Sequence, residues 1–85
     1  MPKTLHSDGH GALISALIEA RKSIGLSQAT LAQRLGCHQS LIARIESGQR
    51  RIDVPELIIL ARALETDPNN VVDQTAASIP LGTKI

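Results

Sequence analysis

The stretch that decides the fold is residues 26–51, LSQATLAQRLGCHQSLIARIESGQRR. Ser27 is a residue type that favours a helix N-cap, and it precedes a helix predicted over residues 28–35, which Gly36 ends. Shortly after this glycine an amphipathic segment predicts a second helix over residues 39–47, followed by another glycine. Two short helices joined by a turn that contains glycine form a helix-turn-helix unit, whose second helix can enter the DNA major groove.

The residue types inside this unit fit the packing that it requires. Helices that cross closely need a small residue near the crossing, which Ala32 supplies, and the sharp turn needs a residue that tolerates positive φ, which Gly36 supplies. Ile42 and Ile45 are expected to anchor the second helix from below. At about 100° per residue, its outward face carries Gln39, Ser40, Ala43, Arg44 and Ser47. Glutamine can pair with adenine, arginine with guanine and serine with a base or a phosphate. The expected base-reading residues are therefore Gln39, Ser40 and Arg44.

Helices are also predicted on both sides of this unit. Apolar residues recur at three- and four-residue steps from Ala12 to a stop at Gly25, which predicts a first helix. Asp53 and Glu56, three residues apart and with a proline between them, form a capping-box pattern that starts a fourth helix. An Asp-Pro pair at residues 67–68 can open a short fifth helix. The sequence therefore predicts an all-α fold of four to five helices.

The same pattern divides the chain into three parts. Residues 1–11 mix polar residues and glycines without apolar periodicity, and they are predicted to be a flexible N-terminal arm. Residues 12–74 hold the helix-turn-helix domain, and residues 75–85 are predicted to be an irregular C-terminal tail. A chain of 85 residues makes one small domain, too short for a core and an enclosed catalytic cleft.

Composition and charge narrow the function further. The chain has no Phe, Tyr or Trp, which argues against binding single strands by base stacking. Its net charge is only +1, but Arg44, Arg50 and Arg51 lie within eight residues and form a local basic footprint. Cys37 is the single cysteine, so no internal disulfide is possible, and no segment has the length and flanks of a signal peptide or a membrane span. A cytoplasmic location is expected.

The stretch from Leu26 to Arg51 resembles the phage repressor and Cro family, also called the XRE family of helix-turn-helix regulators. The residues that fall where that family's pattern expects them are Gln28, Ala32, Gly36, Ile42, Ile45, Glu46 and Gly48. With the flanking helices the similarity extends over about Leu13 to Val72. The resemblance implies a lambda-repressor-like DNA-binding domain.

The resemblance also implies roles for particular residues. Gln28, which opens the second helix of the chain, would grip a phosphate, while the residues that open the third helix read bases. Phosphate contacts are further implied for Gln49, Arg50 and Arg51, just after the third helix. Arg21 and Glu46 would pair and lock the first helix to the third, a structural role.

His38 departs from the family pattern. It stands where relatives often place Ser or Thr as the N-cap of the reading helix, and imidazole caps less well. We count it as a candidate phosphate contact instead.

The expected function is that of a sequence-specific, double-stranded DNA-binding transcriptional regulator, a repressor that reads a palindromic operator as a homodimer. A single reading helix contacts few base pairs, whereas two helices about one DNA turn apart multiply affinity and specificity. The expected dimer interface consists of Ile58, Ile59, Val71 and Val72.

The sequence allows three other interpretations. The main alternative is an antitoxin-type or protein-interaction module whose helical surface binds a partner protein, and a helical bundle without a nucleic-acid role is a further one. An enzyme is remote, because no acid, base and nucleophile converge. No cofactor or metal is expected: one thiol and the scattered histidines His6, His10 and His38 lack zinc-site spacing. A redox role for Cys37 would rest on its position alone.

Overall fold

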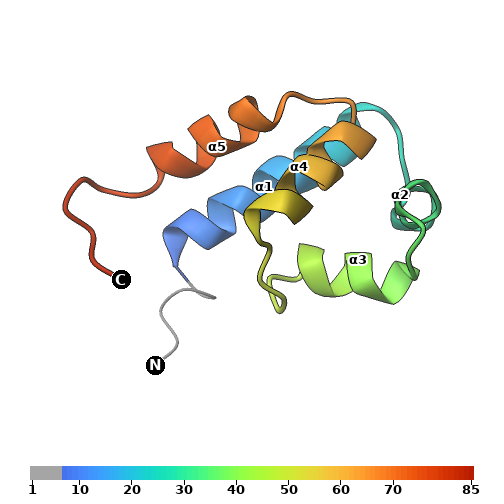
Figure 1. Ribbon diagram of the computed structural model, residues 1–85, viewed down its shortest axis with the longest axis horizontal. Coiled ribbons are helices and arrows are strands. Elements are labelled where there is room, and N and C mark those ends of the chain that lie inside the picture. The colour runs from blue at the N-terminus through green and yellow to red at the C-terminus, as the bar shows by residue number, and fades with distance from the viewer. Residues whose placement is uncertain (1–6) are drawn as a thin grey trace.

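The computed structural model describes residues 7–85. Within this range the chain forms five helices and no strand (Figure 1): α1 (Asp8–Ser23), α2 (Gln28–Leu35), α3 (Gln39–Glu46), α4 (Val54–Ala63) and α5 (Pro68–Ala77). The all-α expectation is therefore confirmed. None of these helices is long and apolar enough to span a bilayer.

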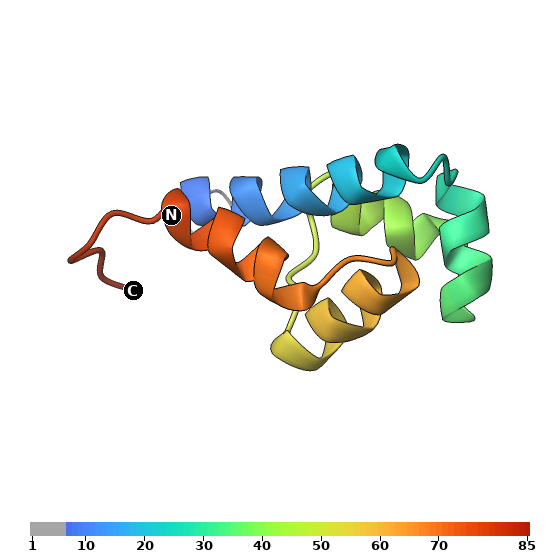
Figure 2. The same ribbon diagram turned by 90° about the horizontal axis from the view of Figure 1, so that it is seen from above.

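Helix α1 begins earlier than the sequence predicted. Ser7 caps it by accepting a hydrogen bond from the His10 backbone N–H at 3.1 Å, so residues 8–11 are helical and the predicted flexible arm over residues 1–11 is wrong for this part. Residues 1–6 of that arm lie outside the described residues. Two glycines lower the intrinsic helix propensity of this turn, but α5 lies alongside α1, as Figure 2 shows, and this packing favours the helix.

Helix α5 is also longer than expected. It starts after Asp67, whose carboxylate accepts from the Asn69 backbone N–H at 2.9 Å, and it continues to Ala77. The irregular tail therefore begins at Ser78 and not at residue 75. The sparse apolar pattern of residues 75–77 did not indicate these additional helical residues.

The helix-turn-helix unit follows the sequence closely. Ser27 caps α2 by accepting from the Thr30 backbone N–H at 3.0 Å, and Gly36 ends α2 with φ of 68°. Gly48, with φ of 80°, follows α3 in the same left-handed conformation. Both glycines occupy a backbone region that a Cβ atom disfavours, so they set the directions in which the chain leaves the two helices.

Helix α4 carries the predicted capping box in full. The Asp53 carboxylate accepts from the Glu56 backbone N–H at 2.8 Å, and the Glu56 carboxylate accepts from the Asp53 backbone N–H at 3.1 Å. At the other end Glu65 has a positive φ of 58° and its carboxylate pairs with Arg34 at 2.8 Å, which ties α2 to the end of α4.

The core is aliphatic and draws on all five helices. Its buried side chains are Ile14, Ala16, Leu17, Leu31, Ala32, Ile42, Ile45, Leu57, Leu60, Ala61, Leu64 and Val71. Val71 is only 2% exposed, so its predicted place at a dimer interface is wrong. One residue further on, the helix has turned by about 100°, and Val72 is 48% exposed.

Candidate nucleic-acid interface

Helix α3 presents a polar face to the outside. Ile42 and Ile45 are 1% and 5% exposed and hold the helix on the core. The opposite face carries the exposed residues Gln39, Ser40, Ala43, Arg44 and Ser47, as the helical spacing predicted. In Figure 1 α3 forms the lower edge of the molecule, on the side away from α5. Because the side chains of its polar face are exposed, no other described helix covers that face.

The three expected base-reading side chains make no hydrogen bond to another described residue. Among the described residues, none donates to or accepts from the side chains of Gln39, Ser40 or Arg44. The Arg44 backbone carbonyl accepts a hydrogen bond from Ser47 Oγ at 3.1 Å, within the helix. Amide, hydroxyl and guanidinium groups arranged in this way can turn their donors and acceptors toward base edges.

A buried carboxylate fixes the position of α3. Glu46, on the last turn of α3, accepts from Arg21 Nε at 2.7 Å and from Arg21 Nη2 at 2.9 Å, so the ion pair that the resemblance implied is present. Arg21 Nη1 donates to the Leu26 carbonyl at 2.7 Å. The hydrogen bonds to Glu46 raise the pKa of Arg21 above its ordinary value, against the opposing effect of burial. One side chain of α1 thus holds both α3 and the chain leading into α2.

Gln28 belongs to the same network. Its amide nitrogen donates to Glu46 Oε1 at 2.9 Å, so the first residue of α2 is tied to the last residue of α3. The side chain is half-buried. A phosphate at the α2 N-terminus would therefore meet a Gln28 amide that Glu46 already orients. The sequence did not indicate this pairing of Gln28 with Glu46.

The three expected phosphate contacts after α3 differ in exposure. Gln49 and Arg51 are exposed. Arg50 is 33% exposed, and it donates to both carboxylate oxygens of Glu56, at 3.0 Å and 2.7 Å. Two hydrogen bonds, first from Arg50 and then from the Asp53 backbone, lower the pKa of Glu56, while those to Glu56 raise the pKa of Arg50. The sequence contained one signal for this pair: Glu56, the glutamate of the capping box, follows Arg50 by six residues.

His38 occupies the N-cap position of α3 with an exposed side chain that makes no capping hydrogen bond. The imidazole thus caps poorly, as expected. The first backbone N–H groups of α3 therefore receive no side-chain acceptor from the cap residue.

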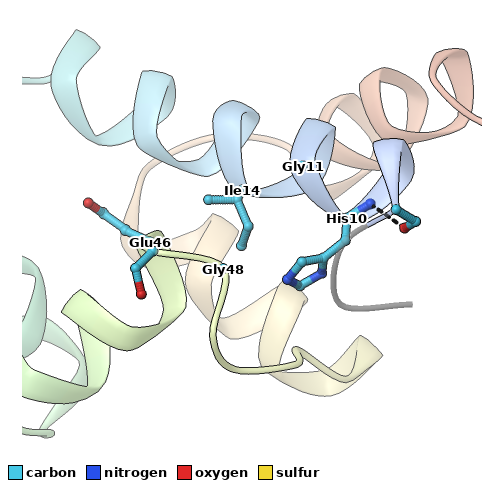
Figure 3. A pocket seen from close by; sticks show the side chains of 7 residues that line it. His10, Gly11, Ile14, Glu46 and Gly48 are labelled. Atoms are coloured by element: carbon cyan, nitrogen blue, oxygen red, sulfur yellow. Dashed lines mark hydrogen bonds between the residues drawn. The ribbon is translucent and has the colours of Figure 1, made fainter. Parts of the chain in front are cut away.

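A cavity of about 270 Å³ lies between the first turn of α1 and the end of α3 (Figure 3). His10 points into it, and the Nε2 atom is buried with no hydrogen-bond partner among the described residues. The other polar side chains that the structure describes in the lining are Ser7, Glu46 and Ser47, and none of these three is cationic. This cavity is distinct from the polar face of α3.

The remaining expected site residues are also placed. Ile59 is 55% exposed, whereas Ile58 is half-buried. Cys37 lies half-buried in the turn between α2 and α3 and packs against the core. Over residues 7–85 there is no cluster of three or more side chains suited to holding a metal ion, and His6 lies outside that range.

Comparison with known proteins agrees with this geometry. The helix-turn-helix family model matches residues 17–70. An XRE-family like protein from Pseudomonas syringae pv. tomato is 38% identical, with a TM-score of 0.81 over 92% of this chain and 95% of that one. The restriction-modification controller protein C.AhdI from Aeromonas hydrophila is 34% identical, with a TM-score of 0.64 over 76% of this chain and 99% of that one.

A curated relative gives the same result. An uncharacterized HTH-type transcriptional regulator from Haemophilus influenzae is 37% identical over 73 residues, which make up 86% of this chain and 66% of the relative's length. The chain therefore belongs to the XRE family of helix-turn-helix transcriptional regulators. Members of this family are DNA-binding regulators and not enzymes.

Proposed function

We propose that the protein is a sequence-specific repressor that binds double-stranded DNA as a homodimer and reads the major groove with α3. The observation that carries the proposal is the division of α3 into two faces. Ile42 and Ile45 hold the helix on the core, and the polar side chains opposite them are exposed and uncommitted. Gln39, Ser40 and Arg44 are the proposed base-reading residues.

Backbone contacts would fix the register of this helix on the duplex. Gln28, His38, Gln49 and Arg51 flank α3 on both sides and carry donors that suit phosphate oxygens. Such contacts add affinity for any sequence, while the contacts to base edges select one.

The proposed dimer uses the exposed apolar residues of α4 and α5. Ile59 and Val72 are 55% and 48% exposed, and Ile58, which precedes Ile59, is half-buried. Covering such side chains with a second copy removes apolar surface from water. Two copies would place two reading helices on one palindromic operator. In the cytoplasm, the bound dimer would repress transcription by excluding other proteins from the same DNA.

A partner protein is the second candidate function, and the tail favours it. Leu81 and Ile85 have relative exposures of 103% and 113%, so nothing in the described chain covers them. An antitoxin-type module would bury such residues against its partner. Co-purification of a defined second chain with the wild type, and its loss in Leu81→Asp, would support this function, whereas the absence of any such chain from the wild type would contradict it.

The test of the proposed function is selection of bound duplexes from a random pool. We expect the wild type to recover one palindromic sequence, and Arg44→Ala to lose about 1–3 kcal/mol and to relax the preference at one base position. Arg62→Ala is the matched control, because Arg62 is an exposed arginine on α4 and not on α3. A wild-type pool without any preference, or equal sequence-blind losses in both variants, would contradict the proposal.

A further inference from the structure

We propose that Arg50 is a positioning residue for DNA binding: held by Glu56, it fixes the backbone of residues 51–53 and so places Arg51 against a DNA phosphate. Arg50 itself then contacts no phosphate. This inference rests on the proposed function, because it assigns a mechanism to the backbone contacts made just after α3.

The first support is the geometry of the Arg50 guanidinium. Nη2 donates to Glu56 Oε2 at 2.7 Å, and Nη1 donates to Glu56 Oε1 at 3.0 Å. Nη1 also donates to the backbone carbonyl of Arg51 at 3.0 Å. A planar guanidinium that meets both oxygens of a carboxylate is held in orientation as well as in position. The third bond extends this hold to the backbone of the next residue.

The second support is that Glu56 holds the other end of the same segment. Its Oε1 atom accepts from the Asp53 backbone N–H at 3.1 Å, and the Asp53 carboxylate accepts from the Glu56 backbone N–H at 2.8 Å. Between these points Ile52 packs against the core. The backbone of residues 51–53 is therefore held at three points: the Arg51 carbonyl, the Ile52 side chain and the Asp53 N–H.

The third support is electrostatic. The Glu56 carboxylate neutralises the charge of Arg50 and would repel a phosphate that approached the same guanidinium. Arg51 follows directly in sequence, and its side chain is exposed. A long arginine side chain on a fixed backbone loses less conformational freedom on binding than one on a mobile loop, which strengthens the phosphate contact.

The two possible roles of Arg50 predict opposite effects of Glu56→Gln. If Arg50 contacted a phosphate directly, loss of the carboxylate would release it and remove a negative charge near DNA, and binding would tighten. If Arg50 positions Arg51, the amide cannot meet the guanidinium with two oxygens, and we expect binding to weaken about three- to tenfold. The probe is the duplex that the wild type selects from the random pool.

The matched control is Glu65→Gln. Glu65 also pairs with an arginine, Arg34, at 2.8 Å, but it lies beyond the end of α4 and outside the segment after α3. This variant removes the same charge without touching residues 51–53, and we expect its affinity to equal or slightly exceed that of the wild type. The change in DNA affinity should have opposite signs in the two variants, which separates an effect on positioning from an effect of net charge.

Further substitutions at Arg50 and Arg51 keep the test decisive if Glu56→Gln lowers stability. Arg50→Lys retains the charge, and an ammonium group contacts a phosphate well, so a direct contact predicts near wild-type binding. Positioning predicts that Arg50→Lys binds as weakly as Arg50→Ala. Arg51→Ala should also reduce affinity less in the Glu56→Gln background than in the wild type, because the contact is already impaired there.

All affinities are measured at a temperature at which circular dichroism shows each variant to be folded. Tighter binding by Glu56→Gln, full retention of affinity by Arg50→Lys, or additive effects of Glu56→Gln and Arg51→Ala would each overturn the inference while leaving DNA binding intact. Failure of the wild type to bind any duplex would overturn the proposed function and this inference together.

Discussion

The side chain of Ile79 lies directly against Gly9, so closely that a Cβ atom at position 9 would come within 2.7 Å of Ile79 Cγ1. Gly11, in the same turn of α1, has no such neighbour within 4 Å. Replacing a helical glycine by alanine raises the free energy of unfolding by about 0.5–1 kcal/mol where space allows. We expect this gain for Gly11→Ala and not for Gly9→Ala, as measured by chemical denaturation.

The contact between the two residues can be isolated in a double variant. In an Ile79→Ala background the obstructing side chain is gone, and Gly9→Ala should then stabilise the protein as Gly11→Ala does. An equal gain for both glycines in the wild-type background would mean that Ile79 moves aside freely and that the tail is not anchored on α1.

The largely shielded ion pair of Arg21 and Glu46 predicts a large effect of removing one partner. The two side chains are only 12% and 9% exposed, so Glu46→Ala leaves a guanidinium with little access to water. We expect a loss of about 3–5 kcal/mol in the free energy of unfolding. For comparison, Arg34→Ala breaks an exposed pair, and its loss should be at most about 1 kcal/mol.

The double variant Arg21→Met with Glu46→Leu should regain much of that stability, because it removes both charges at once. Urea denaturation of the wild type, Arg21→Met, Glu46→Leu and the double variant gives the coupling between the residues. Independent, additive losses would show that the pair does not hold the helices together.

Adjacent valines on α5 should behave differently. Val71 is 2% exposed, and Val71→Ala should lower the free energy of unfolding by about 2 kcal/mol through lost apolar burial. Val72 is 48% exposed, and Val72→Asp should instead weaken self-association in sedimentation experiments while leaving the folded monomer intact. An unchanged association constant in Val72→Asp would remove Val72 from the dimer interface.

Glu56 predicts a pH dependence of stability. Hydrogen bonds from Arg50 and the Asp53 backbone lower the pKa of Glu56 below its ordinary value of 4.5. A carboxylate whose pKa is lower in the folded state stabilises that state above its unfolded pKa, and the contribution is lost as pH falls through the folded value. The wild type should therefore have a higher melting temperature than Glu56→Gln at about pH 7, and this difference in melting temperature should shrink at about pH 3. A difference that stayed constant across this range would contradict the assignment.

The sequence predicted the central unit well because its signals are local. Ser27 and Gly36 mark the two ends of α2 through their own backbone preferences, and the spacing of Ile42 and Ile45 defines the buried face of α3. These features depend on neighbours within one or two helical turns, so they can be predicted from a single sequence.

The misplaced features depend on contacts between distant segments. The first turn of α1 contains two glycines, and only the approach of α5 reveals why it is helical. Val71 and Val72 are equally apolar, so the pattern could not decide which one faces the core. The pairing of Arg50 with Glu56 spans a loop whose path the sequence does not specify.

The side chains of Gln39, Ser40 and Arg44 are exposed and have no hydrogen-bond partner among the described residues. Exchanges at Gln39, Ser40 or Arg44 can therefore redirect the protein to a different target without weakening its folding. Duplicated copies of this scaffold could diverge in the genes they control through a few codon changes, while the aliphatic interior stays the same.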